Sequence, residues 1–372
     1  MSGAMEARVA RLRGARDAEE PGARGIERVA RNPECLRLRA VTIAGITPAT
    51  AAHQILGMPD REGQSPFALT LGQRFERRLI ENGAANLLTL YRDRSRLTVA
   101  DAKIVNVENL APGSSLRARR RRESETRRLL EAKLRGHPDA PNLIIKPRLT
   151  VSLVDVPHPI EPDYLVASDG DRFYRVGELK SYADRDGKTD AADIRGACRQ
   201  AAVGIIALRQ SLVSLGVAAP ETLVEAWCDL ILRAPGSFTP TLRAMTIAGE
   251  VASLDRALAE APRNLDELEA MLPPGGALSD ASVLAAIPNN YRPSCKEHCA
   301  MWSHCRDQTL TAGHPVVLGD HAAEQLAAAG SIARALDLLN RTGQPPRTAA
   351  ETALAQQLQE ADTILQRAVA HG

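Results

Sequence analysis

A short stretch of the sequence, residues 160–180, concentrates side chains that can do hydrolytic chemistry. Two runs rich in Val, Leu, Tyr and Phe flank a Ser-Asp-Gly-Asp segment at 168–171, and this pattern predicts a β-hairpin. Asp163 begins the first predicted strand, and Glu178 and Lys180 end the second. Side chains two positions apart in a strand share a face, so Glu178 and Lys180 project together, and antiparallel pairing places Asp163 beside Glu178. The hairpin therefore gathers two carboxylates and an amine.

These three groups fit metal-assisted phosphodiester hydrolysis. Neighbouring carboxylates repel each other unless a cation lies between them, and Mg²⁺ or Mn²⁺ prefers such oxygen ligands. A metal held there lowers the pKa of a bound water and neutralises charge on a phosphate oxygen. The ammonium of Lys180 can orient the attacking water or stabilise the charge of the transition state. An ordinary charged surface hairpin is the alternative interpretation.

Pro162-Asp163, followed after the hairpin by Glu178-Leu179-Lys180, resembles the PD-(D/E)xK nuclease superfamily. The resemblance implies an α/β fold: a central mixed β-sheet flanked by helices, the restriction-endonuclease-like core. It also implies that Asp163 and Glu178 bind Mg²⁺ or Mn²⁺, with the backbone carbonyl of Leu179 as an extra ligand, and that Lys180 positions the water.

Two further residues match the RecB-like branch of this superfamily. Apolar periodicity predicts a helix over 68–91, and it carries Glu76 shortly after a glycine, where RecB-like nucleases place a metal-binding His or Glu. Glu81, about one turn further on, is the alternative. A second predicted helix begins at Asp190 and carries Gln200, which the resemblance places beside the active site. RecB-like nucleases often have a Tyr four residues later, and this chain has Gly204.

Three of the six cysteines lie within eleven residues, at Cys295, Cys299 and Cys305. This clustering indicates a metal centre rather than packing thiols. Zinc is one candidate, with His298 or His304 as the fourth ligand.

The resemblance favours a different metal centre. RecB-like nucleases of the CRISPR-associated exonuclease and AddB types hold a [4Fe-4S] cluster with one upstream cysteine and three near the end of the domain. Cys35 would be the upstream ligand here, and the cluster would close a loop of about 270 residues. Three residues separate Cys295 from Cys299 where those families commonly have two, which keeps zinc open. Cys198 is the rival fourth ligand, on an apolar helical stripe.

Composition sets the remaining expectations. The chain has 372 residues, 44% of them hydrophobic, and a net charge of +2, so contact with nucleic acid would need a local basic patch. The arginine-rich segment 117–135 is such a patch or a solvated helix face. No apolar run is long enough to span a membrane, and no membrane partner and a cytoplasmic location are expected. We expect a charged tail at 1–30, the nuclease domain at 31–308 and a C-terminal helical hairpin at 309–372. Further strands are predicted at 101–107, 224–232 and 244–247, and one or two strands at 143–154.

The resulting hypothesis is a metal-dependent DNA nuclease, an exonuclease rather than an endonuclease. By resemblance it acts on single-stranded DNA ends, in DNA repair or in anti-phage or CRISPR-type defence. The alternative is a DNA-binding or assembly subunit that cuts weakly or only with a helicase or defence-system protein as its partner.

Overall fold

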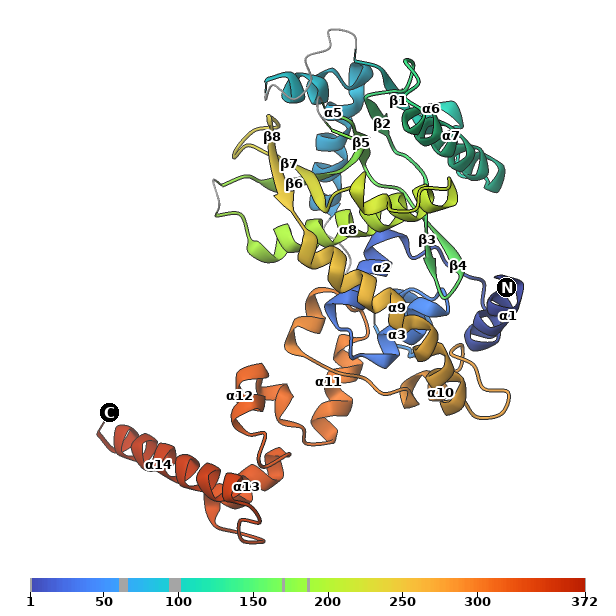
Figure 1. The fold of residues 1–372 in the computed structure, drawn as a ribbon. Helices are drawn as coiled ribbons and strands as arrows, with labels where there is room; N and C mark the ends of the chain where they lie inside the picture. The colour runs from blue at the N-terminus through green and yellow to red at the C-terminus, as the bar shows by residue number, and fades with distance from the viewer. Residues whose placement is uncertain (1, 60–65, 94–101, 169–170, 186–187, 372) are drawn as a thin grey trace.

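The computed structural model describes residues 2–59, 66–93, 102–168, 171–185 and 188–371 (Figure 1). It is a mixed α/β structure in which helices flank a six-stranded mixed sheet, as expected for the fold class. The strand order is β1-β2-β5-β6-β7-β8; β1–β2 and β6–β7 are parallel pairs, and the other neighbours are antiparallel. The strands are β1 (Ile104–Asn106), β2 (Leu143–Ile145), β5 (Tyr164–Val166), β6 (Arg175–Ala183), β7 (Trp227–Arg233) and β8 (Pro240–Thr246).

The predicted strands lie in this sheet with one exception. The segment 143–154 is divided between two sheets, because the backbone turns at Lys146, whose φ is +50°, and Pro147 follows it. Strand β2 ends before this turn. After it, β3 (Leu149–Leu153) pairs antiparallel with β4 (Val156–Ile160) in a separate two-stranded ribbon.

Alternation along the strands gives the main sheet two apolar faces. Leu143 and Ile145 pack with residues of helix α5 (Pro66–Asp93). Ile144, between them, belongs to the core that contains helix α8 (Ala191–Ser214). In β5, Tyr164 and Val166 likewise face α5, and Leu165 faces α8. Because successive side chains of a strand point to opposite faces, this pattern buries the sheet between two helical layers.

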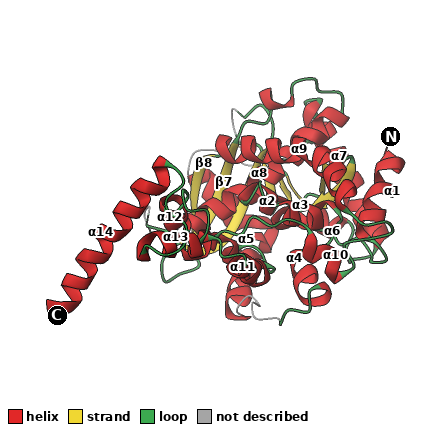
Figure 2. Ribbon diagram, turned by 90° about the horizontal axis from the view of Figure 1, so that it is seen from below, coloured by secondary structure: helices red, strands yellow, loops and turns green. Residues whose placement is uncertain are grey.

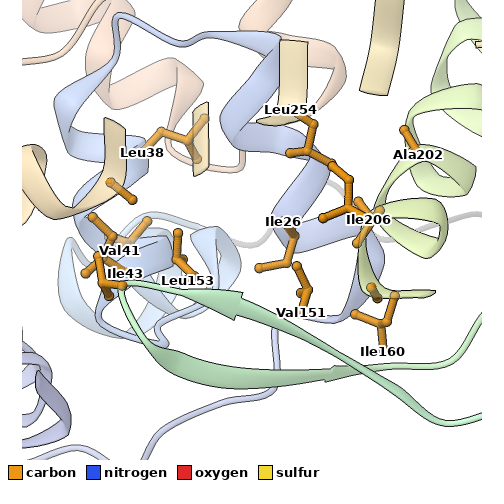
Figure 3. Packing of buried hydrophobic residues seen from close by; sticks show 14 of the residues in the cluster. Ile26, Leu38, Val41, Ile43, Val151, Leu153, Ile160, Ala202, Ile206 and Leu254 are labelled. Carbon is orange, nitrogen blue, oxygen red and sulfur yellow. The ribbon is translucent and has the colours of Figure 1, made fainter. Parts of the chain in front are cut away.

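The larger core lies on the α8 side. It joins α8 to the ribbon β3–β4 and to helices α2 (Gly22–Arg31), α3 (Leu36–Ile43) and α9 (Ala248–Met271). Figure 3 shows side chains of this core in contact. Ile26, Val151 and Ile206 come from three of these elements and converge there. The expected N-terminal tail is therefore, in the structure, two helices that contribute buried residues, Val9 and Leu12 from α1 and Ile26 from α2.

The helices vary widely in length. Helix α5 is interrupted at residues 81–84, where Asn82, Gly83 and Ala84 have positive φ. Helix α14 extends away from the rest of the chain in both views (Figures 1 and 2). The main helices are α1 (Ser2–Arg13), α2 (Gly22–Arg31), α3 (Leu36–Ile43), α5 (Pro66–Asp93), α7 (Leu116–Leu134), α8 (Ala191–Ser214), α9 (Ala248–Met271), α11 (Trp302–Thr311), α13 (Ile332–Asn340) and α14 (Ala349–His371). The short helical elements are α4 (Pro48–Thr50), η1 (Ala51–Ile55), α6 (Val107–Leu110), η2 (Pro220–Thr222), α10 (Ala281–Ala286), η3 (Pro293–Glu297), η4 (Pro315–Leu318) and α12 (Asp320–Gln325).

The C-terminal region contains more than a simple hairpin. Helices α13 and α14 pack together through a small apolar cluster that includes Leu338 and Leu354, and α11, η4 and α12 precede them. Among the described residues, no helix has the length and apolar character that a bilayer-spanning segment needs.

Candidate active site

The hairpin strands β5 and β6 place Asp163 beside the end of the Glu-Leu-Lys segment. Their register sets Tyr164 opposite Gly177, and the Leu179 N–H donates a hydrogen bond of 2.7 Å to Asp163 Oδ2. Gly177 permits this pairing because the Tyr164 ring crosses it, and a Cβ at this position would lie 1.9 Å from Tyr164 Cζ. The turn residues Asp169 and Gly170 lie outside the described part of the chain.

Glu178 and Lys180 share the α8 face of β6, as their spacing predicted. The Lys180 ammonium donates to Glu178 Oε1 at 2.5 Å and to Gln200 Oε1 at 2.8 Å. Between Leu179 and Ala183 the register of β6 against β7 shifts, so Lys180 lies in an irregular part of the strand. Such irregularities re-aim side chains and are frequent beside active sites.

Burial and charge shift both pKa values. The pKa of Glu178 is raised to about 7. Burial is the largest cause; Lys180 lowers the pKa and Asp163 raises it. Burial alone would lower the pKa of Lys180, but the neighbouring Glu178 and Asp163 carboxylates outweigh it and hold the pKa above its ordinary value. Lys180 therefore remains charged at neutral pH, next to a carboxyl group that changes charge near neutrality.

Glu76 reaches the site from α5, through a lysine that the sequence interpretation missed. The Lys146 ammonium contacts Glu76 Oε1 and lies 3.5 Å from Asp163 Oδ1. The Lys146 N–H also donates to the Asp163 carbonyl at 3.0 Å. Burial opposes the charge of Lys146, but Asp163 and Glu76 raise its pKa above the ordinary value. Glu81, the alternative to Glu76, lies at the interruption of α5.

Gln200 lies on α8 within hydrogen-bond distance of Lys180, and Gly204 is one turn further on. A Cβ at Gly204 would lie 3.0 Å from Val176 Cγ1 and 3.3 Å from Pro162 Cγ. The helix therefore approaches the hairpin too closely for a tyrosine at this position. This close approach explains, in packing terms, why position 204 carries a glycine.

The carboxylate oxygens of the candidate site suit a hard divalent cation, although two lysine ammonium groups already contact them. Glu76, Asp163 and Glu178 supply carboxylate oxygens, the ligand type that Mg²⁺ and Mn²⁺ prefer. Within the described ranges, however, no group of three or more His, Cys, Asp or Glu side chains is placed to hold a metal ion. The ammonium of Lys146 lies between Glu76 and Asp163, and that of Lys180 is paired with Glu178. Two ammonium groups thus offset most of the charge of three carboxylates.

The cysteine motif brings the two ends of the expected nuclease domain together. Cys35, Cys295, Cys299 and Cys305 are all buried free thiols. Cys35 caps the start of α3, Cys295 lies in η3 and Cys305 in α11. Each of the last three thiols is close enough to Cys35 for an electrostatic interaction with it.

Residues near Cys35 tie this region together and donate to its sulfurs. Asn32 Nδ2 donates to the Asn290 carbonyl at 2.6 Å and lies 3.5 Å from Cys295 Sγ. Arg37, only 1% exposed, donates to Cys305 Sγ at 3.2 Å and to the carbonyl of Ile287. Donors of this kind tune sulfur ligands in metal centres.

The pKa of Cys305 is raised to about 11. Burial is the largest cause; Arg37 lowers the pKa, and the neighbouring Cys35 and Cys295 raise it. Burial likewise raises the pKa of Cys299. Such thiols favour the protonated form unless a metal replaces the proton. Four buried sulfurs with N–H donors fit a soft metal centre chemically, but, as for the carboxylates, the described side chains are not arranged around one metal position. Cys198 packs elsewhere, against Cys228 of β7 and 3.9 Å from Met245 Sδ.

The arginine-rich segment 117–135 forms most of α7, and many of its charges are already paired. Arg119 and Arg122 form ion pairs with Glu20 and Glu161, at 2.9 and 3.6 Å. Arg128 and Arg135 pair with glutamates of the same helix. These contacts favour a structural and solvated role for α7 over a continuous track for nucleic acid.

Compared with models of protein families, with curated proteins and with solved structures, the chain gives no match.

Proposed function

We propose that the protein is a metal-dependent DNA nuclease with a restriction-endonuclease-like core of the RecB-like type. One observation carries this proposal: Asp163, Glu178, Lys180, Glu76 and Gln200 come from a hairpin and two helices that are distant in sequence, yet form one connected group. These are the residues that the sequence motifs single out. A chance match of short motifs gives no reason for such convergence.

In the proposed reaction, Asp163, Glu178 and Glu76, with the Leu179 carbonyl, would hold Mg²⁺ or Mn²⁺. The chemistry that such an ion would supply there is an acidified water and neutralisation of charge on the phosphate. Lys180, kept charged by Glu178, donates hydrogen bonds to the attacking water or to the phosphate oxygen on which charge develops. Gln200 fixes the Lys180 side chain, and the Leu179 N–H fixes Asp163.

The finer parts of the proposal rest on the family resemblance. They are exonuclease action on single-stranded DNA ends, a role in repair or anti-phage defence, and a cytoplasmic location. A [4Fe-4S] cluster on Cys35, Cys295, Cys299 and Cys305, or zinc as the alternative, would stabilise the junction of the two chain ends.

The test is cleavage of end-labelled single- and double-stranded DNA in Mn²⁺, with EDTA as the metal-free control. We expect Asp163→Asn and Lys180→Ala each to reduce the rate by on the order of 10²-fold or more. Glu221→Gln and Lys188→Ala, which change exposed residues outside the site, should cut like the unmodified protein. Unchanged cleavage by both site variants would end the assignment.

The second candidate is a DNA-binding or assembly subunit that cuts weakly or only with a helicase or defence-system partner. It is favoured by the position of Lys146, whose ammonium lies where a metal would join Glu76 to Asp163. Tight binding of DNA without cutting in Mg²⁺ or Mn²⁺ would support this candidate.

A further inference from the structure

A cleft of about 1010 Å³ lies beside the candidate active site. One wall is α2, another is the first turns of α8, and a third is the segment that carries Cys299. Gln200 lines the cleft, and the same Gln200 side chain accepts a hydrogen bond from Lys180. The cleft therefore borders the proposed reaction centre at Gln200.

Arginine side chains gather on the α2 side of this cleft. Arg24, Arg28 and Arg31 line it and recur at intervals of four and three residues, which places them on one helical face. The Arg31 guanidinium lies over Gly196 of α8, where a Cβ would be 3.2 Å from Arg31 Nη2. Arg199 follows on α8 and, with Arg28 and Arg31, acts electrostatically on the ring of His298.

These cations are only partly neutralised by the protein. Glu27 pairs with Arg31 at 2.8 Å. Among the described residues, the side chains of Arg24 and Arg28 form no ion pair or hydrogen bond. Burial lowers the pKa of Arg28; Glu27 opposes the shift, and Arg24 and Arg31 add to it. Clustered guanidinium groups that repel each other indicate a site for an anion.

Two histidine nitrogens in the same cleft also lack a partner. His298 and His304 line it, and the Nε2 atom of each is buried without a hydrogen-bond partner among the described residues. Buried polar atoms are normally satisfied, so an unsatisfied pair in a cleft indicates that a ligand or water completes it. Trp302 and Tyr182 line the cleft as well and provide ring surfaces.

We propose that this cleft binds the phosphate backbone of a single-stranded polynucleotide, with Arg24, Arg28, Arg31 and His298 forming a phosphate subsite. The link to cleavage rests on the proposed function, whereas the phosphate subsite does not. Ring stacking beside a cationic track is the usual way in which proteins hold single strands. The cleft lies at the upper end of ligand-cavity volumes, about 300–1,000 Å³, which suits a few nucleotides rather than a double helix.

Carboxylates confine the track to one side of the cleft. Asp190 and Asp193 line it at the start of α8, and Glu297 and Asp307 line it on the cysteine-bearing segment. A polyanion would be repelled by these groups, so the strand is expected to follow the α2 wall.

The test is fluorescence anisotropy in EDTA, which prevents cutting, with a labelled oligothymidylate of about 12 nucleotides and a duplex of equal length. We expect the unmodified protein to bind the single strand more tightly than the duplex. Arg24→Ala combined with Arg28→Ala should weaken binding about tenfold or more, and each lost phosphate contact should reduce the slope of log affinity against log salt by about 0.7. Arg28→Lys should retain part of the affinity.

Arg117→Ala and Arg120→Ala remove exposed charges from α7 and serve as matched controls that should bind normally. Melting curves verify that all variants fold. Equal binding by the folded Arg24→Ala/Arg28→Ala variant, no binding by the unmodified protein, or equal preference for the duplex would overturn the inference. If the unmodified protein and its variants bind as expected but the unmodified protein does not cut DNA in Mn²⁺, only the nuclease proposal fails.

Discussion

At the residue scale, the titration of Glu178 couples the site to pH. Its pKa is raised from 4.5 to about 7 because the carboxyl group is buried. Between these two values the folded state holds a proton that the unfolded state has released, so the free energy of unfolding falls as pH rises through this window. The Glu178→Gln variant has no titratable group at this position. In EDTA, we expect the melting temperature of the unmodified protein to fall relative to Glu178→Gln as pH rises from about 4.5 to about 7.

The control is Glu221→Gln, an exposed carboxylate, which should follow the unmodified protein at every pH. If the melting temperatures of Glu178→Gln and the unmodified protein change in the same way between about pH 4.5 and about pH 7, Glu178 does not titrate as its burial implies.

Lys146 provides a second prediction at this scale. Its ammonium lies between Glu76 and Asp163, so Lys146→Met should leave two neighbouring carboxylates without a shared cation. In EDTA we expect a loss of about 1–3 kcal/mol in the free energy of unfolding. Mn²⁺ should then raise the melting temperature of Lys146→Met more than that of the unmodified protein, because the ion no longer competes with an ammonium.

Lys103→Met is the matched control, since Lys103 pairs with the exposed Asp139 at the surface. It should change neither stability nor the response to Mn²⁺. An equal Mn²⁺ response in Lys146→Met and the unmodified protein would contradict a divalent-ion site at these carboxylates.

Sequence reasoning found the acidic residues of this group but not Lys146. Asp163, Glu178 and Lys180 share one hairpin, where strand alternation and antiparallel pairing fix their neighbours. Lys146 lies in the turn that follows another strand, β2, and its position depends on sheet order, which local spacing does not encode. The available signal was the Lys-Pro pair after an apolar run, because proline after a strand marks a break.

At the element scale, the close contact between α8 and the hairpin explains the glycine at position 204. We expect Gly204→Tyr to destabilise the protein by about 1–3 kcal/mol or more, because its Cβ already meets Val176 and Pro162 and the ring has no space. Thermal unfolding measures the loss. Gly249→Ala is the control: this glycine is also helical, but nothing lies within 4 Å of its Cβ position, so alanine should stabilise by about 0.5–1 kcal/mol.

A folded Gly204→Tyr protein of unchanged stability would mean that α8 can move away from the hairpin. In that case Gln200 would not be held against Lys180, and the positioning role proposed for it would fail.

Elements with a strong local pattern were predicted well, and those defined by distant contacts were not. The apolar run that contains β7 and the stripe of α8 are buried on several sides, and both appear near their predicted positions. The interruption of α5 has only the Asn82-Gly83 pair as a local signal, which the surrounding helical periodicity hides. The charged N-terminal helices looked like a tail because few of their residues are apolar, yet Val9, Leu12 and Ile26 suffice to anchor them.

At the scale of the whole molecule, the segment around Cys35 holds the two ends of the expected nuclease domain together. Asn32 and Arg37 already bond to residues 285–305, and Arg37 does so while almost fully buried. A metal centre on the four cysteines would add a second link at the same place. Because binding to the folded state alone stabilises that state, loss of the metal should lower the melting temperature.

Cys35→Ser tests this link, since it removes one sulfur without disturbing the hydrogen bonds of Asn32 or Arg37. Protein purified without oxygen should contain iron and absorb broadly in the visible range, and Cys35→Ser should lose most of the metal and melt at a lower temperature. Cys198→Ala removes the rival thiol, which packs against β7, and should retain the metal. Metal lost from Cys198→Ala but kept by Cys35→Ser would reverse the ligand assignment, and a colourless protein with stoichiometric zinc would replace iron by zinc. If neither metal is present, contacts such as those of Asn32, Glu34 and Arg37 join the two ends without it, and the melting temperature of Cys35→Ser should then match that of the unmodified protein.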